Sequence, residues 1–546
     1  MSRLRLFQSP VAKNRQENQS LLAGEDEKIF EDPRFEHYEA TSNLQLFFDL
    51  FFVANLTSFT NVHEINDRHK LTSYIGFIAL LWFTWAQVTL YDIRFATDSV
   101  FERLAHACHF GVMVGFAVIG PSFLETHEEW GPQQQMSIIL MASRLVLFCQ
   151  YGAALCFTWR YHRTRTPLLI IMGTLLVAAA IYLGISFVFY RHLDYHCYIV
   201  WYVVSVLEAV INVGVASWWP VVSLYKAHLV ERMTCLTLII LGEGIIGLTK
   251  TIVKVETMDS KFTSADIGMI ISAVLIIYFV YQIYFDSICL EALSHIQQQI
   301  WGLLHFPFHL ALCLMMEGIN QTLLWSHIVA DSRTIFLPLN TALDNDAAAP
   351  ELKTVLNNTI TYVYSNFDST QDVWDDVQKS MNETLALPDS ADTDEVLETA
   401  FGAVTETMKT VIEAFGWEMP TETLTEGAEG FWETAHEILK VFNLTFGYFV
   451  ICTGIILMLS SVFSMLASKH DREHYHLRYL STIINSVVGL GIALLSCMTL
   501  TDSAETLGAS PWALPGLMLI MLVLLIIHHL PRGRYESVVK EPGPEC

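Results

Sequence analysis

Twelve long apolar runs constrain this chain more than any other feature. Each approaches the roughly 20 residues that a helix needs to cross a hydrocarbon core about 30 Å thick. Backbone polar groups inside lipid must be satisfied within the segment, which favours helices. The sequence therefore predicts an all-α membrane protein with a bundle of about 12 transmembrane helices, at 44–61, 72–92, 104–124, 136–159, 167–190, 197–218, 233–253, 266–286, 301–325, 440–467, 479–498 and 511–530.

Composition agrees with a chain that folds in lipid. The 546 residues are 53% hydrophobic and only 16% charged, whereas soluble domains carry about 25% charged residues. An ordinary soluble enzyme is excluded on this ground. The formal net charge of -25, with no clustered basic tract, also argues against a nucleic-acid partner. The expected partner is the lipid bilayer.

The distribution of basic residues predicts the orientation. Short cytoplasmic loops are enriched in Lys and Arg, and placing the N-terminal tail 1–43 inside puts most of the basic loops inside as well. The tail 531–546 then also lies inside, so both termini are expected to be cytoplasmic, in the plasma membrane. This topology places five basic residues outside, namely Arg68, Lys70, Arg191, Lys254 and Lys261.

An acidic insert at 331–435 separates the core spans at 44–325 from the last three spans at 440–530. It holds 21 Asp and Glu against four basic residues. We expect it on the extracellular or lumenal side, where the sequons at Asn357 and Asn382 are glycosylation candidates. Helical spacing after Asp392 predicts one amphipathic helix, so the insert is partly helical. The insert is either a solvent-exposed segment without a binding role or a surface that recruits a cation or a partner.

Ionisable residues inside the spans are the main functional candidates. Each costs roughly 2.5 to 3.5 kcal/mol at the centre of a helix, so it is paired or faces a cavity. Glu243 lies between two glycines in the middle of its span, and Glu208 is similarly central. These residues are candidates for transport or proton coupling, and the alternative is that they form salt bridges that only stabilise helix packing. The candidates are Glu243, Glu208, Asp49, Arg144 and Glu317. Arg144 is a natural counter-charge for one of the acids.

Two histidine pairs suggest a metal hypothesis. His106 and His109 are three apart, and His305 and His309 are four apart, spacings at which two side chains on a helix can share an ion. No Glu accompanies either pair, however, and Pro307 is expected to distort the second. We therefore predict packed or proton-relaying histidines and no metal. No catalytic or nucleotide-binding motif is present either, so we expect no enzyme and no cofactor.

Three segments resemble one known family. The run from Asn43 to Val53 is similar to the opening signature Glu-Leu-Phe-Phe-Asp-Leu-Val-Phe-Val of the low temperature requirement A (LtrA) family, although Gln45 replaces its first Glu. The runs 228–232 with 239–243, and 91–95, resemble further motifs of that family. The resemblance implies a polytopic bundle without assigning an activity, and it marks the positions Asp49, Arg94, His228, Glu231, Arg232 and Glu243. The acidic insert is outside the family's common pattern.

We expect a transporter or channel-like protein that moves a small ion or solute through a cavity lined by the first nine spans. Glu243 and Glu208 would be the coupling acids, and Glu231 and Arg232 would form a cytoplasmic gate or anchor. Burial favours the neutral form of a carboxyl group, so proton coupling is the expected mechanism. The alternative is a membrane scaffold or sensor in which the buried charges are purely structural and the insert recruits a partner or cation. Both the transporter and the scaffold hypothesis are compatible with a homo-oligomer.

Overall fold

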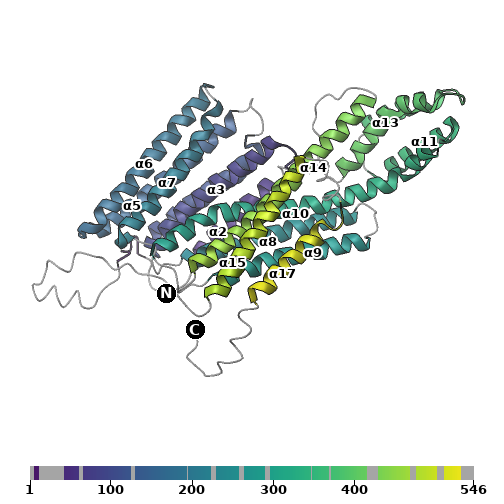
Figure 1. Ribbon diagram of the computed structural model, residues 1–546. Helices are drawn as coiled ribbons and strands as arrows, with labels where there is room; N and C mark the ends of the chain where they lie inside the picture. Colours follow the sequence, from purple (N-terminus) through teal and green to yellow (C-terminus); the bar gives the residue numbers. More distant parts are fainter. Residues whose placement is uncertain are drawn as a thin grey trace, which may run out of the picture.

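The computed structural model describes residues 5–11, 42–60, 65–124, 130–193, 195–222, 229–257, 263–288, 295–345, 347–367, 371–414, 428–467, 475–500 and 510–529. Most of these residues lie in helices, and there is no strand among them (Figure 1). The all-α prediction is confirmed for this part of the chain.

Ten of the described helices are long and apolar enough to cross a membrane. Their apolar stretches match ten of the predicted spans, which confirms a polytopic membrane protein. They are α3 (Arg68–Phe95), α4 (Val100–Ile119), α5 (Gly131–Thr158), α6 (His162–Tyr190), α7 (Ile199–Trp218), α8 (Leu229–Thr257), α9 (Ser264–Ser287), α10 (His295–Asp344), α14 (Ala428–Ala467) and α15 (Tyr475–Leu494).

The predicted number of about twelve is not confirmed. The first predicted span forms the 18-residue helix α2 (Asn43–Thr60), whose polar residues lower its hydropathy. The last forms α17 (Ala513–His529), which has only 17 residues and is nearly a turn short of a full span. Even so, α2 belongs to the bundle, because its Phe48, Phe52 and Phe59 are fully buried.

The bundle is organised around α3. This is the most buried of the ten spans, and it contacts α2, α5, α7, α8 and α10. Figure 1 shows α5, α6 and α7 on one side of it and α9, α15 and α17 on the other. Large apolar side chains such as Val177, Phe187 and Ile271 are exposed on the outer helices, as expected for faces that contact lipid.

The insert contains more helix than the sequence suggested. Helices α10 and α14, with 50 and 40 residues, are about 75 and 60 Å long at 1.5 Å per residue, well beyond a bilayer core. At their far ends lie α11 (Ala349–Asn366), α12 (Gln371–Ala386) and α13 (Thr393–Ala414), which pack around a small core of their own that includes Leu352, Val377 and Val396 (Figure 1). The prediction of one amphipathic helix was too low. It matches α13. The apolar residues of α12 are interrupted by four acids, and those of α11 by Asn and Thr.

The short N-terminal segment 5–11 lies on the first turn of α4. The backbone N–H groups of Val100 and Phe101 donate to the carbonyls of Arg5 and Leu6 at 3.0 and 3.1 Å. These donors have no partner inside their own helix, so the segment satisfies them. Phe7 also packs on Phe101, with ring centroids 5.1 Å apart.

Candidate functional site

Helices α2 and α8 place the buried acids along one polar file. Asp49 on α2 contacts Arg232 on α8, and eight residues further along α2 Thr57 contacts Glu243 on α8. The two helices therefore run in the same direction. At 1.5 Å per residue the two contacts are about 12 Å apart along α2.

The first contact is an ion pair without solvent exposure. Arg232 Nη2 lies 2.8 Å from Asp49 Oδ1, and both side chains are 0% exposed. Trp85 Nε1 donates to the same oxygen at 2.7 Å, and Arg232 Nη2 also lies 3.3 Å from the Thr89 hydroxyl. Asp49 Oδ2 and Arg232 Nε and Nη1 make no hydrogen bond to the described residues. The pair thus anchors α2, α3 and α8 to one another. Three of its polar atoms remain without a hydrogen-bond partner among the described residues.

The second contact borders what we call the acid cavity. Thr57 Oγ1 donates to Glu243 Oε2 at 2.6 Å, and Gln321 Nε2 donates to Glu317 Oε1 at 2.8 Å. Glu243 and Glu317 both line a cavity of about 40 Å³, above the roughly 10–15 Å³ that a site needs to hold a water. No Lys, Arg or His occurs among its described lining residues, which are Leu56, Thr60, Tyr74, Ile240, Glu243, Gly244, Gly247, Cys313, Met316, Glu317 and Asn320.

Two glycines of α8 allow α10 to come close enough to form this cavity. A Cβ atom on Gly244 would lie 2.6 Å from Met316 Sδ, and one on Gly247 would lie 2.5 Å from Asn320 Nδ2. Small residues permit such helix approaches in membranes. Of the two glycines that flank Glu243, only Gly244 has this role, since Gly242 faces open space.

Arg144 and Glu208 form a different kind of pair. Arg144 Nε lies 3.2 and 3.1 Å from the two oxygens of Glu208, and Nη2 donates to Oε2 at 2.8 Å. Its Nη1 donates to the Thr84 hydroxyl at 3.0 Å, and the guanidinium lies over the Tyr182 ring. Glu208 is therefore the acid for which Arg144 provides the counter-charge. The pair is closed, because every polar atom of both side chains has a partner.

His305 and His309 bind neutral partners separately. His309 Nδ1 accepts from Trp82 Nε1 at 3.0 Å, so its proton is on Nε2, which lies 2.8 Å from the Thr237 hydroxyl. His305 Nδ1 faces a backbone carbonyl one turn earlier, and its Nε2 lies 2.9 Å from the Tyr284 hydroxyl. Helix α10 continues through Pro307. In the described part of the chain, no three potential metal-ligating side chains come together.

A wider pocket opens where α2 begins, and we call it the vestibule. It has a volume of about 890 Å³ and is formed by the start of α2, the end of α3 and the first turns of α4. Arg94, Asp92, Glu102 and His106 line it. Arg94 is buried and donates from Nη1 to Asn212 Oδ1 at 2.7 Å. The sequence reasoning singled out Arg94 and His106 but not Asp92 or Glu102, although Glu102 precedes His106 by one helical turn.

The remaining candidates lie apart from these sites. His109 lies deeper on α4, where Nε2 is 2.8 Å from Gln150 Oε1. Glu231 is half-buried in the first turn of α8, and His228 lies outside the described residues. Asn357 and Asn382 are both exposed, on α11 and α12.

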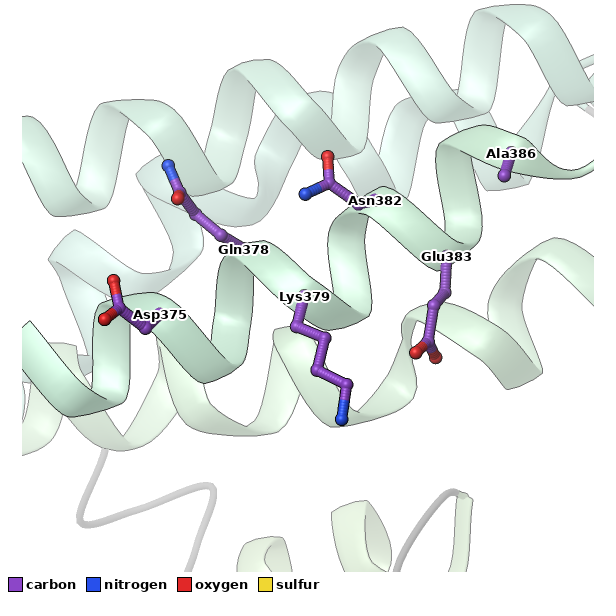
Figure 2. Close-up of a pocket in the computed structure, with 6 residues that line it drawn as sticks. All are labelled: Asp375, Gln378, Lys379, Asn382, Glu383 and Ala386. Carbon is purple, nitrogen blue, oxygen red and sulfur yellow. The ribbon is translucent and has the colours of Figure 1, made fainter.

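A shallow hollow on α12 surrounds Asn382. Figure 2 shows side chains on one face of this helix, including Asp375, Lys379 and Glu383. All its lining residues come from α12, so this is a solvated helix face and not an enclosed site.

The bundle, the extended insert and the buried polar file define the class: a polytopic helical membrane protein. The family model for the bacterial low temperature requirement A protein (LtrA) matches residues 40–343, more than half of the chain, and the protein therefore belongs to the LtrA family. The matched range runs from α2 into α10 and includes the polar file and the vestibule. No curated protein and no solved structure matches the chain.

Proposed function

We propose that this protein moves a small cation across the membrane, coupled to protons, through the polar file between α2, α3, α8 and α10. The acid cavity is the observation that carries the proposal. Glu243 and Glu317 face one space from α8 and α10, and the described lining offers them no basic side chain.

The electrostatics of the acid cavity favour a bound proton or cation. An isolated carboxylate removed from water is strongly destabilised unless it takes up a proton or finds a cation. Each of the two acids has one hydrogen bond from a neutral donor, Thr57 or Gln321. A space of about 40 Å³, with two acids and no basic side chain among its described lining residues, fits a proton or a small cation.

The rest of the polar file supports a path to that cavity. From the vestibule at the start of α2, the file passes the Asp49–Arg232 pair, in which Asp49 Oδ2 has no partner among the described residues. It ends at Thr57 and the acid cavity. The proposal requires no catalytic group, no cofactor and no partner other than the bilayer and the transported ion. It places the vestibule and both termini on the cytoplasmic side of the plasma membrane.

The test is ion flux in reconstituted vesicles. Purified protein in liposomes that enclose a pH-sensitive dye should move protons when a Na⁺ or K⁺ gradient is imposed. Glu243→Gln and Glu317→Gln should each reduce this flux at least tenfold. Glu256→Gln is the matched control, because Glu256 is exposed on the same helix as Glu243. Equal flux in all four proteins, or none in the wild type with either cation, would contradict the proposal.

A scaffold or sensor is the second candidate function, and the closed Arg144–Glu208 pair favours it. The separate core of α11, α12 and α13 also lets the insert act as a unit that recruits a partner or cation. Under this reading, Glu243→Gln lowers thermal stability in detergent and no preparation shows flux. Removing the insert would then abolish activity and leave the bundle folded.

A further inference from the structure

We propose that Asp92 and His106, in the wall of the vestibule, form a proton-binding site that exchanges protons with the water at this end of the bundle. The inference deepens the proposed function and rests on it for its role, since it identifies where protons enter the polar file. Its geometry stands independently of any transport.

The hydrogen bonds of His106 fix where its protons lie. Its Nδ1 is 2.9 Å from the backbone carbonyl of Glu102, which can only accept, so Nδ1 carries a proton. Its Nε2 is 3.2 Å from Asp92 Oδ2. Both ring nitrogens therefore face acceptor groups, and the geometry points to an imidazolium paired with a carboxylate.

The pair is enclosed by protein at the edge of a large pocket. The side chains of His106 and Asp92 are 3% and 0% exposed, yet both residues line the vestibule of about 890 Å³. Asp92 Oδ1 has no hydrogen-bond partner among the described residues. This buried oxygen is an acceptor without a described partner, on the acid that faces His106 Nε2 at the edge of the vestibule.

Glu102 is a second acid beside His106, one turn earlier on α4. It accepts from the Tyr91 hydroxyl at 2.6 Å and from Gln150 Nε2 at 2.8 Å. These hydrogen bonds hold Glu102 in place and leave Asp92 as the partner of His106 Nε2.

The other charged and titratable groups around the pair are mostly engaged elsewhere. Arg94 donates to Asn212, while Asp98 and Arg103 form a bidentate pair at the surface. The set that faces the site from α2, α3, α4, α5 and the α3–α4 turn is Asp49, Tyr91, Arg94, Asp98, Glu102, Arg103, His109 and Tyr151.

The position of the pair links the vestibule to the polar file. The start of α2, from Ser42 to Phe47, forms one wall of the vestibule. Asp49 follows on the next turn and interacts electrostatically with Asp92. A proton released by His106 would therefore meet Asp49 as the next acid toward the acid cavity.

The test is nitrogen NMR on the full chain, labelled at histidine and held in lipid nanodiscs. His106→Gln identifies the His106 signal by its loss. We expect both His106 nitrogens to be protonated at pH 7 in the wild type. In Asp92→Leu, and also in Asp92→Asn, whose amide can donate to Nε2, only Nδ1 should keep its proton. His309→Gln is the control, because His309 has neutral partners and should leave the His106 signal unchanged. A single protonated nitrogen on His106 in the wild type, or no change in both Asp92 variants, overturns the inference.

A flux measurement separates this inference from the proposed function. His106→Gln should reduce proton flux in the vesicle assay at least threefold, whereas His309→Gln should preserve the flux per folded molecule. If His106 is doubly protonated but the wild type moves no ion, the proposed function fails and the proton site stands. If flux depends on Glu243 but not on His106, the entry site is wrong and the proposed function survives.

Discussion

Glu208 and Glu243 are two glutamates of the same bundle in opposite surroundings. Both lie in the interior of a spanning helix, and both are buried, with 3% and 8% exposure. Glu208 has a guanidinium bound to both oxygens, whereas Glu243 has a single threonine hydroxyl and faces a cavity shared with a second acid. Depth in the bundle is therefore a poor guide to the role of a buried carboxyl group. The chemistry of its partner distinguishes a packing element from a binding site.

Breaking the closed Arg144–Glu208 pair should cause the largest loss of unfolding free energy. Arg144→Leu leaves Glu208 buried without a counter-charge and should cost about 3 to 5 kcal/mol of unfolding free energy. Thermal unfolding in detergent measures the loss. The double variant Arg144→Leu/Glu208→Leu should recover most of it, because it removes both charges together. A single variant as stable as the wild type would show that the pair does not hold the bundle together.

The Asp49–Arg232 pair should have an intermediate effect. Asp49→Asn keeps an acceptor for Trp85 but removes the charge that balances Arg232. We expect a loss of about 1.5 to 3 kcal/mol, the range for a hydrogen bond to a charged group, in the same unfolding assay. Asp98→Asn is the control, since that carboxylate is exposed and should stay within about 0.5 kcal/mol of the wild type. If the two variants behave alike, the buried pair is not an anchor.

A close contact between α14 and α15 that involves no charged group should have a smaller effect on the unfolding free energy. A Cβ on Gly489 of α15 would lie 2.9 Å from the Gly454 carbonyl oxygen on α14. Gly489→Ala should therefore cost about 1 to 3 kcal/mol through overpacking. Gly491→Ala on the same helix faces open space and should be neutral or stabilising by up to about 1 kcal/mol. Equal melting temperatures for the two variants would show that the close contact between α14 and α15 does not limit stability.

The smallest change in stability is expected at the acid cavity. Glu243→Gln removes no ion pair, and the new amide oxygen can still accept from Thr57. The unfolding free energy should change by no more than about 1 kcal/mol, the scale of one neutral hydrogen bond. A loss as large as that of Arg144→Leu would make Glu243 a packing element like Glu208 and would favour the scaffold function.

Much of the fold could be predicted from the sequence, because long apolar runs identify spanning helices directly. The apolar run 167–190, which lies within α6, needs no tertiary information. The helices α11 and α12 were missed, because α12 is rich in acids and α11 is rich in Asn and Thr, and such segments resemble solvated loops. The borderline segments α2 and α17 show where the count of spans becomes uncertain, since their length or hydropathy is marginal.

The site could be predicted only as a set of residues. Glu243, Glu317, Glu208 and Arg144 are conspicuous in sequence, because a charge inside an apolar run is rare. Their pairing is not visible, since Arg144 meets a glutamate 64 positions away and the acid cavity depends on the approach of α8 to α10. Asp92 was missed for a different reason: a charged residue near the end of a span is ordinary, and only the fold places it beside His106.

The most direct measurement compares proton flux per folded molecule for Glu243→Gln and Glu208→Gln in the same vesicles. The account predicts that Glu243→Gln keeps its melting temperature and loses the flux, while Glu208→Gln melts earlier but still conducts at temperatures where it is folded. The opposite pattern, or flux that is unchanged in Glu243→Gln, would contradict the assignment of the acid cavity as the ion-binding site.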